Sequence, residues 1–376
     1  MSARRHRPLA RTSRRGVVMA DVAREAGVSL QTVSRVLNGS GAVREATRAA
    51  VLRVIDELGY RPNLQARSLA SRRSGLLGVL VVGTVYHGLA ATLLAVEAAA
   101  RRAGLLVTLT QVAAHERADV GAAMAHIAGQ RPECLVVLAQ HGQTVPRVLA
   151  HRGEVPAVLL LSGQHDLPGV STVSFDQDEA IRLLLEHVAA RGARHAVHVA
   201  GPANWTDATA RGAAFDRLTP VLGMSGTVLE AGAWSAEAGF RAGERLIAGE
   251  LPDAVLAAND QLALGLLAAL RRHGVHVPRD VVVTGFDDVP GTGYFDPPLT
   301  TIRQDFVALG SAAVACAEEL RDGGRPRDVR VAPRLVVRIS TDRPADASAP
   351  RADISAPRTS ESLTDSSTPI DSRPTH

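Results

Sequence analysis

From residue 74 to residue 341 the sequence alternates between short apolar runs and longer segments of helical periodicity. Apolar runs rich in β-branched residues are typical of strands buried on both faces of a parallel sheet. Strands that alternate with helices indicate right-handed βαβ units. The predicted strands cover residues 76–82, 105–110, 134–138, 157–161, 196–199, 254–257 and 281–284, and the predicted helices include residues 89–103, 179–190, 236–248 and 260–273. The sequence therefore predicts an α/β fold of parallel sheets flanked by helices.

This α/β region is too long for one comfortable hydrophobic core. Single cores stop growing at roughly 250–300 residues, and longer chains divide into separate units. We therefore expect two lobes within residues 74–341. In open sheets of this kind, ligands bind outside the carboxyl ends of the strands, so any ligand site is expected there.

The charge is divided unevenly along the chain. Residues 1–73 hold 15 arginines against five acids, whereas the rest of the chain holds 27 arginines against 33 acids. A basic end joined to a mildly acidic body indicates a polyanionic partner for that end alone, and nucleic acid is the first candidate. The sequence contains no lysine, which excludes a lysine nucleophile, a Schiff base and a Walker-type phosphate lysine.

Other features exclude secreted and membrane classes. Cys134 and Cys316 are too few for a disulfide framework and lack metal-ligand spacing. Residues 74–96 carry no Asp, Glu or Arg, but the polar and glycine-containing segment 83–88 interrupts them, so we expect a strand, a loop and a helix there rather than a membrane span. We expect a cytoplasmic protein without membrane contact.

The two ends of the chain differ from the rest in composition. Residues 1–16 are rich in arginine and lack the apolar core of a secretory signal peptide, so they are expected to form a disordered basic arm. Residues 342–376 are rich in Ser, Thr, Pro and Asp. This tail cannot bury enough apolar surface to offset its ordering entropy, and we predict that it is disordered.

Residues 17–62 are helical in pattern, and residues 21–38 have helix-turn-helix form. The first helix ends at Gly27, which can adopt a positive φ in a tight turn. Ser29 is placed to cap the second helix. The positions near the start of that helix that face outward are the ones that meet base edges in the major groove. Arginine there can contact guanine, and glutamine can contact adenine.

The segments Asp21-Val22-Ala23, Ala26-Gly27-Val28-Ser29 and Thr32-Val33-Ser34-Arg35-Val36-Leu37-Asn38 are similar to the signature of the LacI (lac repressor) family. The likeness continues through Thr47-Arg48, Gly59-Tyr60-Arg61-Pro62-Asn63 and Leu69-Ala70. The resemblance implies a helix-turn-helix DNA-binding domain over residues 17–62. It also implies a hinge helix over residues 63–73 that enters the minor groove, with Leu69 wedged between base pairs.

The residues that the resemblance places on DNA are Ser29, Leu30, Gln31, Thr32, Ser34, Arg35, Asn38, Thr47, Asn63 and Leu69. Gln31 and Arg35 are expected to contact bases. Thr32 and Ser34 either contact phosphate or cap and pack, and Leu30 either touches a thymine methyl group or covers the core. Val18 and Arg44 stand where the family usually has a threonine and a capping serine, so two helix caps are expected to be missing.

The region 74–341 resembles the periplasmic-binding-protein-like effector-binding and dimerisation core of the same family, and most closely its lac repressor branch. The strongest matches are residues 233–240, 257–265, 284–288 and 297–306. The resemblance implies that an N-terminal all-α head is joined to a two-lobed α/β core. It implies an effector site built from Tyr86, Arg211, Trp234, Asn259, Asp287 and Phe306.

These residue types suit sugar recognition. Arg211, Asn259 and Asp287 would bind vicinal hydroxyl groups, and Trp234 and Phe306 would cover the C–H face of the ring. Structural roles stay open: the aromatic side chains are often core residues, Asp287 could cap a turn, and Arg211 could pair with a structural acid. The strand 156–161 ends on apolar residues where the lac branch has an acid. A sugar is therefore implied, and a galactoside-like glycoside stays open.

No catalytic motif is evident. The sequence has no Gly-x-Gly-x-x-Gly run after the first strand, no Gly-x-Ser-x-Gly elbow and no His-Glu-x-x-His motif. We expect no catalytic residue, metal or cofactor. The resemblance implies a homodimeric repressor that binds near-palindromic operator DNA and that a small sugar effector releases. A free sugar-binding protein or a sugar-processing enzyme with the same core fold remains an alternative.

Overall fold

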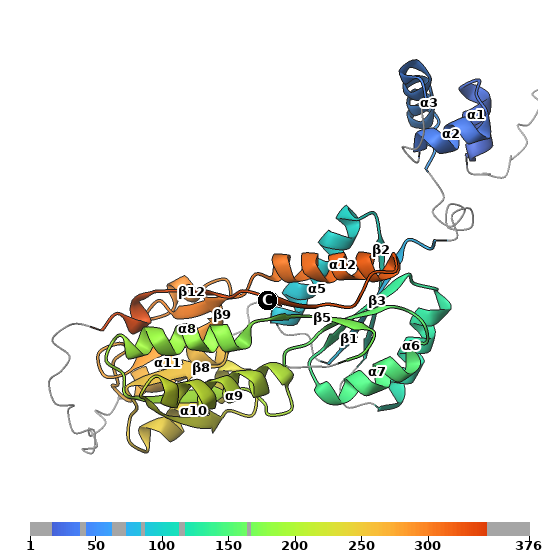
Figure 1. Cartoon of the computed structure of the whole chain (residues 1–376). Coiled ribbons are helices and arrows are strands. Elements are labelled where there is room, and N and C mark those ends of the chain that lie inside the picture. Colours follow the sequence, from blue (N-terminus) through green and yellow to red (C-terminus); the bar gives the residue numbers. More distant parts are fainter. Residues whose placement is uncertain are drawn as a thin grey trace, which may run out of the picture.

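The structure is a computed structural model, and it describes residues 17–37, 43–61, 73–83, 87–112, 117–163 and 167–343. A head of three helices precedes two α/β lobes (Figure 1). The predicted basic arm, most of the predicted hinge and most of the predicted tail lie outside the described residues. So do four of the predicted site residues, Asn38, Asn63, Leu69 and Tyr86.

The head consists of α1 (Met19–Glu25), α2 (Leu30–Leu37) and α3 (Glu45–Glu57). Its small core contains Val22, Val33 and Val51, one from each helix, and each of these side chains is fully buried. Helix α1 begins after Val18 and α3 begins after Arg44, and neither residue makes a side-chain cap hydrogen bond. The predicted loss of two caps is therefore confirmed.

Lobe 1 contains a parallel six-stranded sheet with the order β11-β5-β4-β3-β1-β2. Helices α5 and α12 cover one face of this sheet, and helices α6 and α7 cover the other. The elements are β1 (Leu76–Val82), α5 (His87–Arg102), β2 (Leu106–Val112), α6 (Arg117–Gly129), β3 (Cys134–Ala139), α7 (Val145–His151), β4 (Ala157–Leu160), β5 (Val170–Phe175), α12 (Phe306–Arg321) and β11 (Asp328–Val331).

Lobe 2 repeats this plan with the strand order β12-β10-β9-β8-β6-β7, in which only β12 is antiparallel to its neighbour. Helices α10 and α11 pack on one face, and α8 and α9 pack on the other. The elements are α8 (Gln177–Ala189), β6 (His195–Ala200), α9 (Thr206–Val221), β7 (Ser225–Glu230), α10 (Ala236–Ile247), β8 (Ala254–Ala257), α11 (Asp260–Arg272), β9 (Val282–Asp287), β10 (Thr300–Arg303) and β12 (Arg334–Val336).

The chain passes between the lobes three times, after β5, after β10 and after β11. Figure 1 shows the two lobes joined along these connections. The prediction of an all-α head followed by a two-lobed core of parallel sheets flanked by helices is confirmed. Among the described residues, no helix is both long enough and apolar enough to span a bilayer.

Candidate nucleic-acid interface and ligand pocket

Helix α2 carries five of the seven predicted DNA contacts that the structure describes. Leu30, Gln31 and Arg35 are exposed, whereas Val33 and Val36 on the opposite face are buried in the head. Leu30 is 52% exposed, so it does not cover the core. A short helix with one apolar face buried and one polar face free is the arrangement that the major groove accepts.

The turn between α1 and α2 fixes the angle at which this face is presented. Gly27 has a φ of 63°, as predicted for the tight turn. The Ser29 Oγ accepts a hydrogen bond from the Thr32 backbone N–H at 3.2 Å and lies 2.9 Å from the Thr32 hydroxyl. The cap that the sequence predicts is therefore present, and the Thr32 hydroxyl is hydrogen-bonded to the capping Ser29 side chain. Ser34 and Thr47 are both half-buried.

A cavity of about 160 Å³ lies between the two lobes, at the carboxyl ends of strands from both sheets. Five of the six predicted effector residues line it, namely Arg211, Trp234, Asn259, Asp287 and Phe306. They come from four helices or loops and one strand that are far apart in the sequence. This location agrees with the expectation that ligands bind where parallel strands end.

Arg211 lies on α9 and is 3% exposed. Its Nε donates to the Gln177 Oε1 at 2.9 Å, and its Nη1 donates to the Ala258 carbonyl oxygen. Its guanidinium carbon lies 3.6 Å from the centroid of the Phe286 ring. The remaining Nη2 lies 4.0 Å from a carboxylate oxygen of Asp207 and 4.0 Å from one of Asp287. The protein therefore holds the guanidinium in place and leaves one nitrogen facing the pocket.

Asp287 is the last residue of β9, and its φ of 104° is unusual for a residue with a side chain. Such a conformation costs roughly 1–3 kcal/mol and is common at functional sites. Burial raises the pKa of Asp287 to about 8, although Arg211 lowers it in part. The Asp260 and Asp207 carboxylates add to the increase. Burial therefore favours the protonated form of this carboxyl group, whereas the guanidinium of Arg211 favours the ionised form.

Asn259 and Trp234 position each other. The Asn259 Oδ1 accepts from the Leu262 N–H at 2.8 Å and so caps α11, while its Nδ2 donates to the Trp234 carbonyl oxygen at 3.2 Å. The Trp234 ring covers Gly201, where an added Cβ would collide with the indole. Trp234 is 6% exposed, packs in the core of lobe 2 and also lines the pocket. The structural and ligand-facing interpretations are therefore compatible for this residue.

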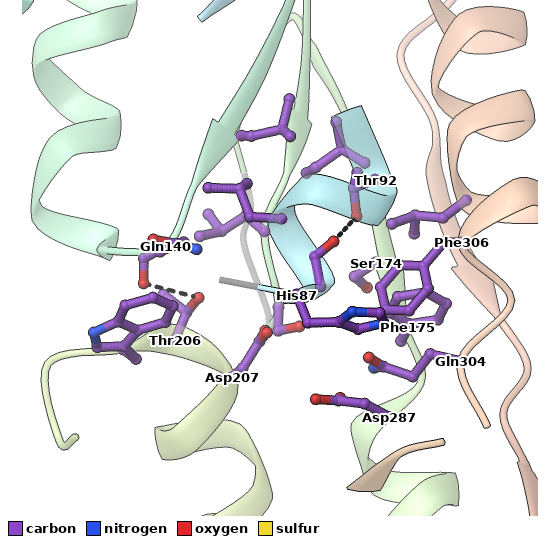
Figure 2. Close-up of a pocket in the computed structure, with 18 of the residues that line it drawn as sticks. His87, Thr92, Gln140, Ser174, Phe175, Thr206, Asp207, Asp287, Gln304 and Phe306 are labelled. Atoms are coloured by element: carbon purple, nitrogen blue, oxygen red, sulfur yellow. Dashed lines mark hydrogen bonds between the residues drawn. The ribbon is translucent and has the colours of Figure 1, made fainter. Parts of the chain in front are cut away.

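Phe306 is the first residue of α12 and is half-buried. Its ring packs edge-to-face on Phe175 with the centroids 5.3 Å apart, and on His87 with the centroids 6.0 Å apart. Figure 2 shows His87 in the middle of the cavity, between Thr92 above it and the carboxyl groups of Asp207 and Asp287 below it. Phe306 thus forms a lateral wall of the pocket.

Sequence reasoning missed several polar and aromatic residues of the pocket: His87, Gln140, Trp205, Asp207 and Gln304. Asp207 could have been found, because it lies four residues before Arg211 and so shares its helix face. Gln304 lies within the segment 297–306 that carries the family resemblance. The others follow strand ends or begin a helix, and no motif identifies them.

Three buried polar atoms of the pocket have no hydrogen-bond partner among the described residues: the Gln140 Oε1, the Trp234 Nε1 and the Gln304 Nε2. A buried polar group without a partner costs about 1–3 kcal/mol. The residues that carry this acceptor and these two donors line the cavity, but the atoms themselves are covered by neighbouring groups. The described residues contain no cluster of metal-binding side chains.

Asp288, the residue after Asp287, forms ion pairs with two arginines outside the pocket. It accepts from the Arg338 Nη2 at 2.7 Å and from the Arg303 Nε at 2.6 Å. Burial by itself would raise its pKa, but these arginines lower it below the usual value. Asp288 does not line the pocket, so the pair of adjacent acids does not present two carboxyl groups to a common ligand.

Comparisons with known proteins agree with this arrangement. A model of a periplasmic binding protein-like domain matches residues 185–341, and a model described as bacterial regulatory proteins, lacI family, matches residues 18–63. The lactose operon repressor of Escherichia coli (strain K12) is 33% identical over 330 residues, which are 86% of this chain and 90% of that protein.

Two solved structures extend the comparison. The lac repressor dimer bound to operator and the anti-inducer ONPF has a TM-score of 0.76 at 31% identity, covering 87% of this chain and 99% of that one. A complex of the transcriptional regulator CelR with cellobiose has a TM-score of 0.65 at 28% identity, covering 86% of this chain and 99% of that one. With its helix-turn-helix head and two-lobed core, this chain belongs to the lacI family of bacterial regulatory proteins and is a DNA-binding transcriptional regulator.

Proposed function

We propose that this regulator is a homodimeric repressor that binds a near-palindromic operator and is released when a small sugar occupies the pocket between its lobes. The observation that supports this most directly is the set of pocket groups around Arg211. A fixed guanidinium and the carboxyl groups of Asp207 and Asp287 line one cavity beside aromatic rings, together with the amide side chains of Gln140 and Gln304. Vicinal hydroxyl groups on a ring with an apolar C–H face complement that set.

The DNA side of the proposal depends on the exposed face of α2. In a dimer, two such faces would contact half-sites about one helical turn apart, and the operator would share the two-fold symmetry of the protein. The named proteins in the comparison include a lac repressor dimer bound to operator and a CelR–cellobiose complex. We propose the same kinds of partner, an operator duplex and a sugar, for this chain.

Release requires that the sugar bind more tightly to one arrangement of the lobes than to the other. The chain passes between the lobes three times, and the pocket has groups from both. A ligand between the lobes would therefore change their relative position. The predicted hinge at residues 63–73 would transmit this change to the head, and Leu69 would be its contact with the minor groove.

The direct test measures DNA binding and sugar binding on the same full-length protein. A symmetric operator would first be selected from a random DNA library. Fluorescence anisotropy would then measure its affinity with and without a panel of mono- and disaccharides. We expect tight, salt-sensitive binding that at least one sugar weakens. Loss of residues 1–73 should abolish DNA binding, and an operator preference that survives this deletion would contradict the proposal.

We further propose that the pocket binds its ligand without converting it and that the protein acts in the cytoplasm, where the DNA is. Thermal stabilisation by a sugar that is recovered unchanged would support binding without turnover. Disappearance of a glycoside on prolonged incubation, in proportion to the amount of protein, would favour the enzyme alternative instead.

A further inference from the structure

The turn that follows β9 holds the Asp287 carboxyl group on an unusual backbone. Asp287 has a φ of 104° and Asp288 has a φ of 54°, so two consecutive residues with side chains lie in the left-handed region. Such conformations are unfavourable and persist only where the surrounding structure fixes them. Asp287 and Val289 line the pocket, and Figure 2 shows the Asp287 carboxyl group there. The contacts that fix this turn therefore decide where that carboxyl group lies.

Asp260 lies behind this turn, on the side away from the pocket. It is the first residue of α11, it is completely buried, and it does not line the pocket. Its Oδ2 accepts a hydrogen bond from the Val289 N–H at 2.8 Å, and its Oδ1 accepts one from the Thr301 hydroxyl at 2.6 Å. One carboxyl group therefore joins the start of α11 to the end of the turn and to β10.

The packing around Asp260 holds its side chain in one place. Gly285, two residues before Asp287, lies against the Asp260 carboxyl group, and a Cβ added to Gly285 would collide with the Asp260 Oδ1. Thr301 lies beside Gly285 in the neighbouring strand β10. Strands β9 and β10 and the start of α11 therefore enclose this carboxyl group, which makes it a rigid support for the turn.

The hydrogen bonds of Asp260 are compatible with either of its protonation states. Burial raises the pKa of Asp260 to about 7, although the hydrogen bonds from Thr301 and the Val289 backbone lower it in part. The Thr301 hydroxyl can donate to an ionised carboxylate or accept from a carboxylic acid. The other carboxyl oxygen can accept from the Val289 N–H in both states. The support for the turn therefore persists when Asp260 gains or loses its proton.

We propose that Asp260 is a positioning residue for effector binding, which holds the left-handed turn from the core of lobe 2 and so places the Asp287 carboxyl group in the pocket. Asp288 holds the same turn from its other side, through Arg303 and Arg338. Asp260 acts through Asp287 and does not touch the effector itself. This inference rests on the proposed effector pocket and assigns a role to a residue outside its lining.

Hydrogen exchange on the full-length protein without ligand tests the support itself. Asp260→Ala removes both acceptors, so amide exchange in residues 286–290 should become about tenfold faster. Asp260→Asn can still accept from the Val289 N–H and donate to the Thr301 hydroxyl, so exchange there should stay within about threefold of that in the unchanged protein. Mass spectrometry of peptides that cover residues 286–290 would measure both rates.

Asp253→Ala is the matched control. Asp253 stands directly before β8, at the opposite end of this strand from Asp260, and it does not line the pocket. Its Oδ2 accepts from the backbone N–H groups of Arg194 and His195 at 2.8 and 2.9 Å. Asp253→Ala should therefore destabilise lobe 2 by a similar loss of acceptors and leave exchange in residues 286–290 unchanged.

Sugar binding by the same variants separates positioning from stability. The probes are glucose, galactose, lactose and cellobiose, and the fluorescence of Trp205 and Trp234 reports binding, because these two are the only tryptophans of the chain and both line the pocket. Asp260→Ala should weaken the binding of the tightest probe about tenfold, and Asp260→Asn by no more than about threefold. Asp253→Ala should lower the urea midpoint of unfolding with the sugar affinity unchanged.

Thr301→Val is the milder variant should Asp260→Ala fail to fold. It removes one of the two donors to Asp260 and should accelerate exchange in residues 286–290, and weaken sugar binding, by about threefold each. Thr284→Val is its control. Thr284 lies on the neighbouring strand β9, is completely buried, and has a hydroxyl without a hydrogen-bond partner among the described residues. Both readouts should be unchanged in this control.

The outcomes separate this inference from the proposed function. Exchange in residues 286–290 that is no faster in Asp260→Ala and Thr301→Val than in the two controls overturns the inference, whether or not a sugar binds. A sugar affinity that falls as far in Asp253→Ala as in Asp260→Ala also overturns it, because the effect of Asp260 would then be one of general stability. If no sugar binds or affects operator binding, the proposed function fails, and the exchange rates alone decide the inference.

Discussion

The α2 face and the interlobe pocket, the two proposed binding sites, differ in how much of the chain contributes to each. The described DNA-facing candidates on α2 and at its N-cap lie within the seven residues from Ser29 to Arg35. The pocket collects residues from His87 to Leu309, and many of them hold one another in place. The effects of substitutions on α2 should therefore be independent of one another, whereas each substitution in the pocket should change both folding stability and ligand affinity. Four predictions test this contrast.

The largest effect is expected for Arg211→Ala. This change leaves the largely buried Asp287 and the partly exposed Asp207 without their cation, and it leaves Gln177 and the Ala258 carbonyl group without a donor. Removing one partner of a buried ion pair costs about 3–5 kcal/mol, so both folding stability and sugar affinity should fall. Urea denaturation would measure the loss.

The control for this change lies on the same helix. Arg217 is 54% exposed and pairs with Asp178, so Arg217→Ala should change the free energy of unfolding by no more than about 0.5 kcal/mol. If the two variants were equally stable, the pocket would not be the interdependent unit that we describe.

Next in size is Arg35→Ala on the exposed face of α2. Loss of a base contact should weaken operator binding by about 1–3 kcal/mol and relax the preference at one base position. The free energy of unfolding should stay the same within about 0.5 kcal/mol, because Arg35 is exposed. Binding to operator variants substituted at each base would show this. Equal weakening on all sequences would instead assign Arg35 to a phosphate.

A smaller effect concerns the pH dependence of sugar binding. The pKa of Asp287 is raised from 3.8 to about 8 by burial. Between these two pH values the folded state keeps a proton that the unfolded state releases, so the contribution of Asp287 to the free energy of unfolding falls as the pH rises. A hydroxyl group that donates to the carboxylate favours its ionised form. Sugar affinity should therefore increase about tenfold between about pH 6.5 and pH 8, as calorimetry at several pH values would measure. Asp287→Asn should remove this increase, and an affinity that fell with pH would reverse the assigned role.

The smallest effect is expected for Ser29→Ala, which removes the cap of α2. The Thr32 N–H loses one of its two acceptors and keeps the Ser29 carbonyl oxygen at 3.0 Å, and the Thr32 hydroxyl loses its hydrogen bond to Ser29. The expected cost is about 1 kcal/mol. Operator affinity should fall modestly and without a change in base preference. Ser29→Asp restores a capping oxygen and should recover the thermal stability of the head. A change in base preference for Ser29→Ala would show that Ser29 contacts bases directly.

The sequence predicted an element correctly where a few neighbouring residues carry its pattern. The strands 76–82 and 254–257 were predicted with the bounds that the structure shows, because each is a continuous apolar run buried on both faces. The strand Ser225–Glu230 was missed because it lies at a sheet edge and is largely exposed. The strand Val170–Phe175 was missed because serine and threonine interrupt its apolar pattern, although every residue in it is buried.

The pocket residues, too, were predicted only where the local sequence identifies them. Arg211, Trp234, Asn259, Asp287 and Phe306 were predicted from segments that resemble the family, and the structure brings all five to one cavity. Trp205 and Gln140 were missed, because their importance depends on contacts between the lobes. The Thr206 N–H donates to the Gln140 carbonyl oxygen at 3.0 Å, and the ring of Trp205 packs against His141. No pattern along the chain brings residues 140 and 206 together.

The head, the alternation of strands and helices and the difference in charge between the two ends could all be predicted from the amino-acid sequence, because periodicity, capping and composition act over a few residues. Which polar groups meet between the lobes, and that two acids share one guanidinium, became evident only from the folded arrangement of the chain. Those features depend on strand order and on three passages between the lobes, which set distances between residues more than 200 positions apart.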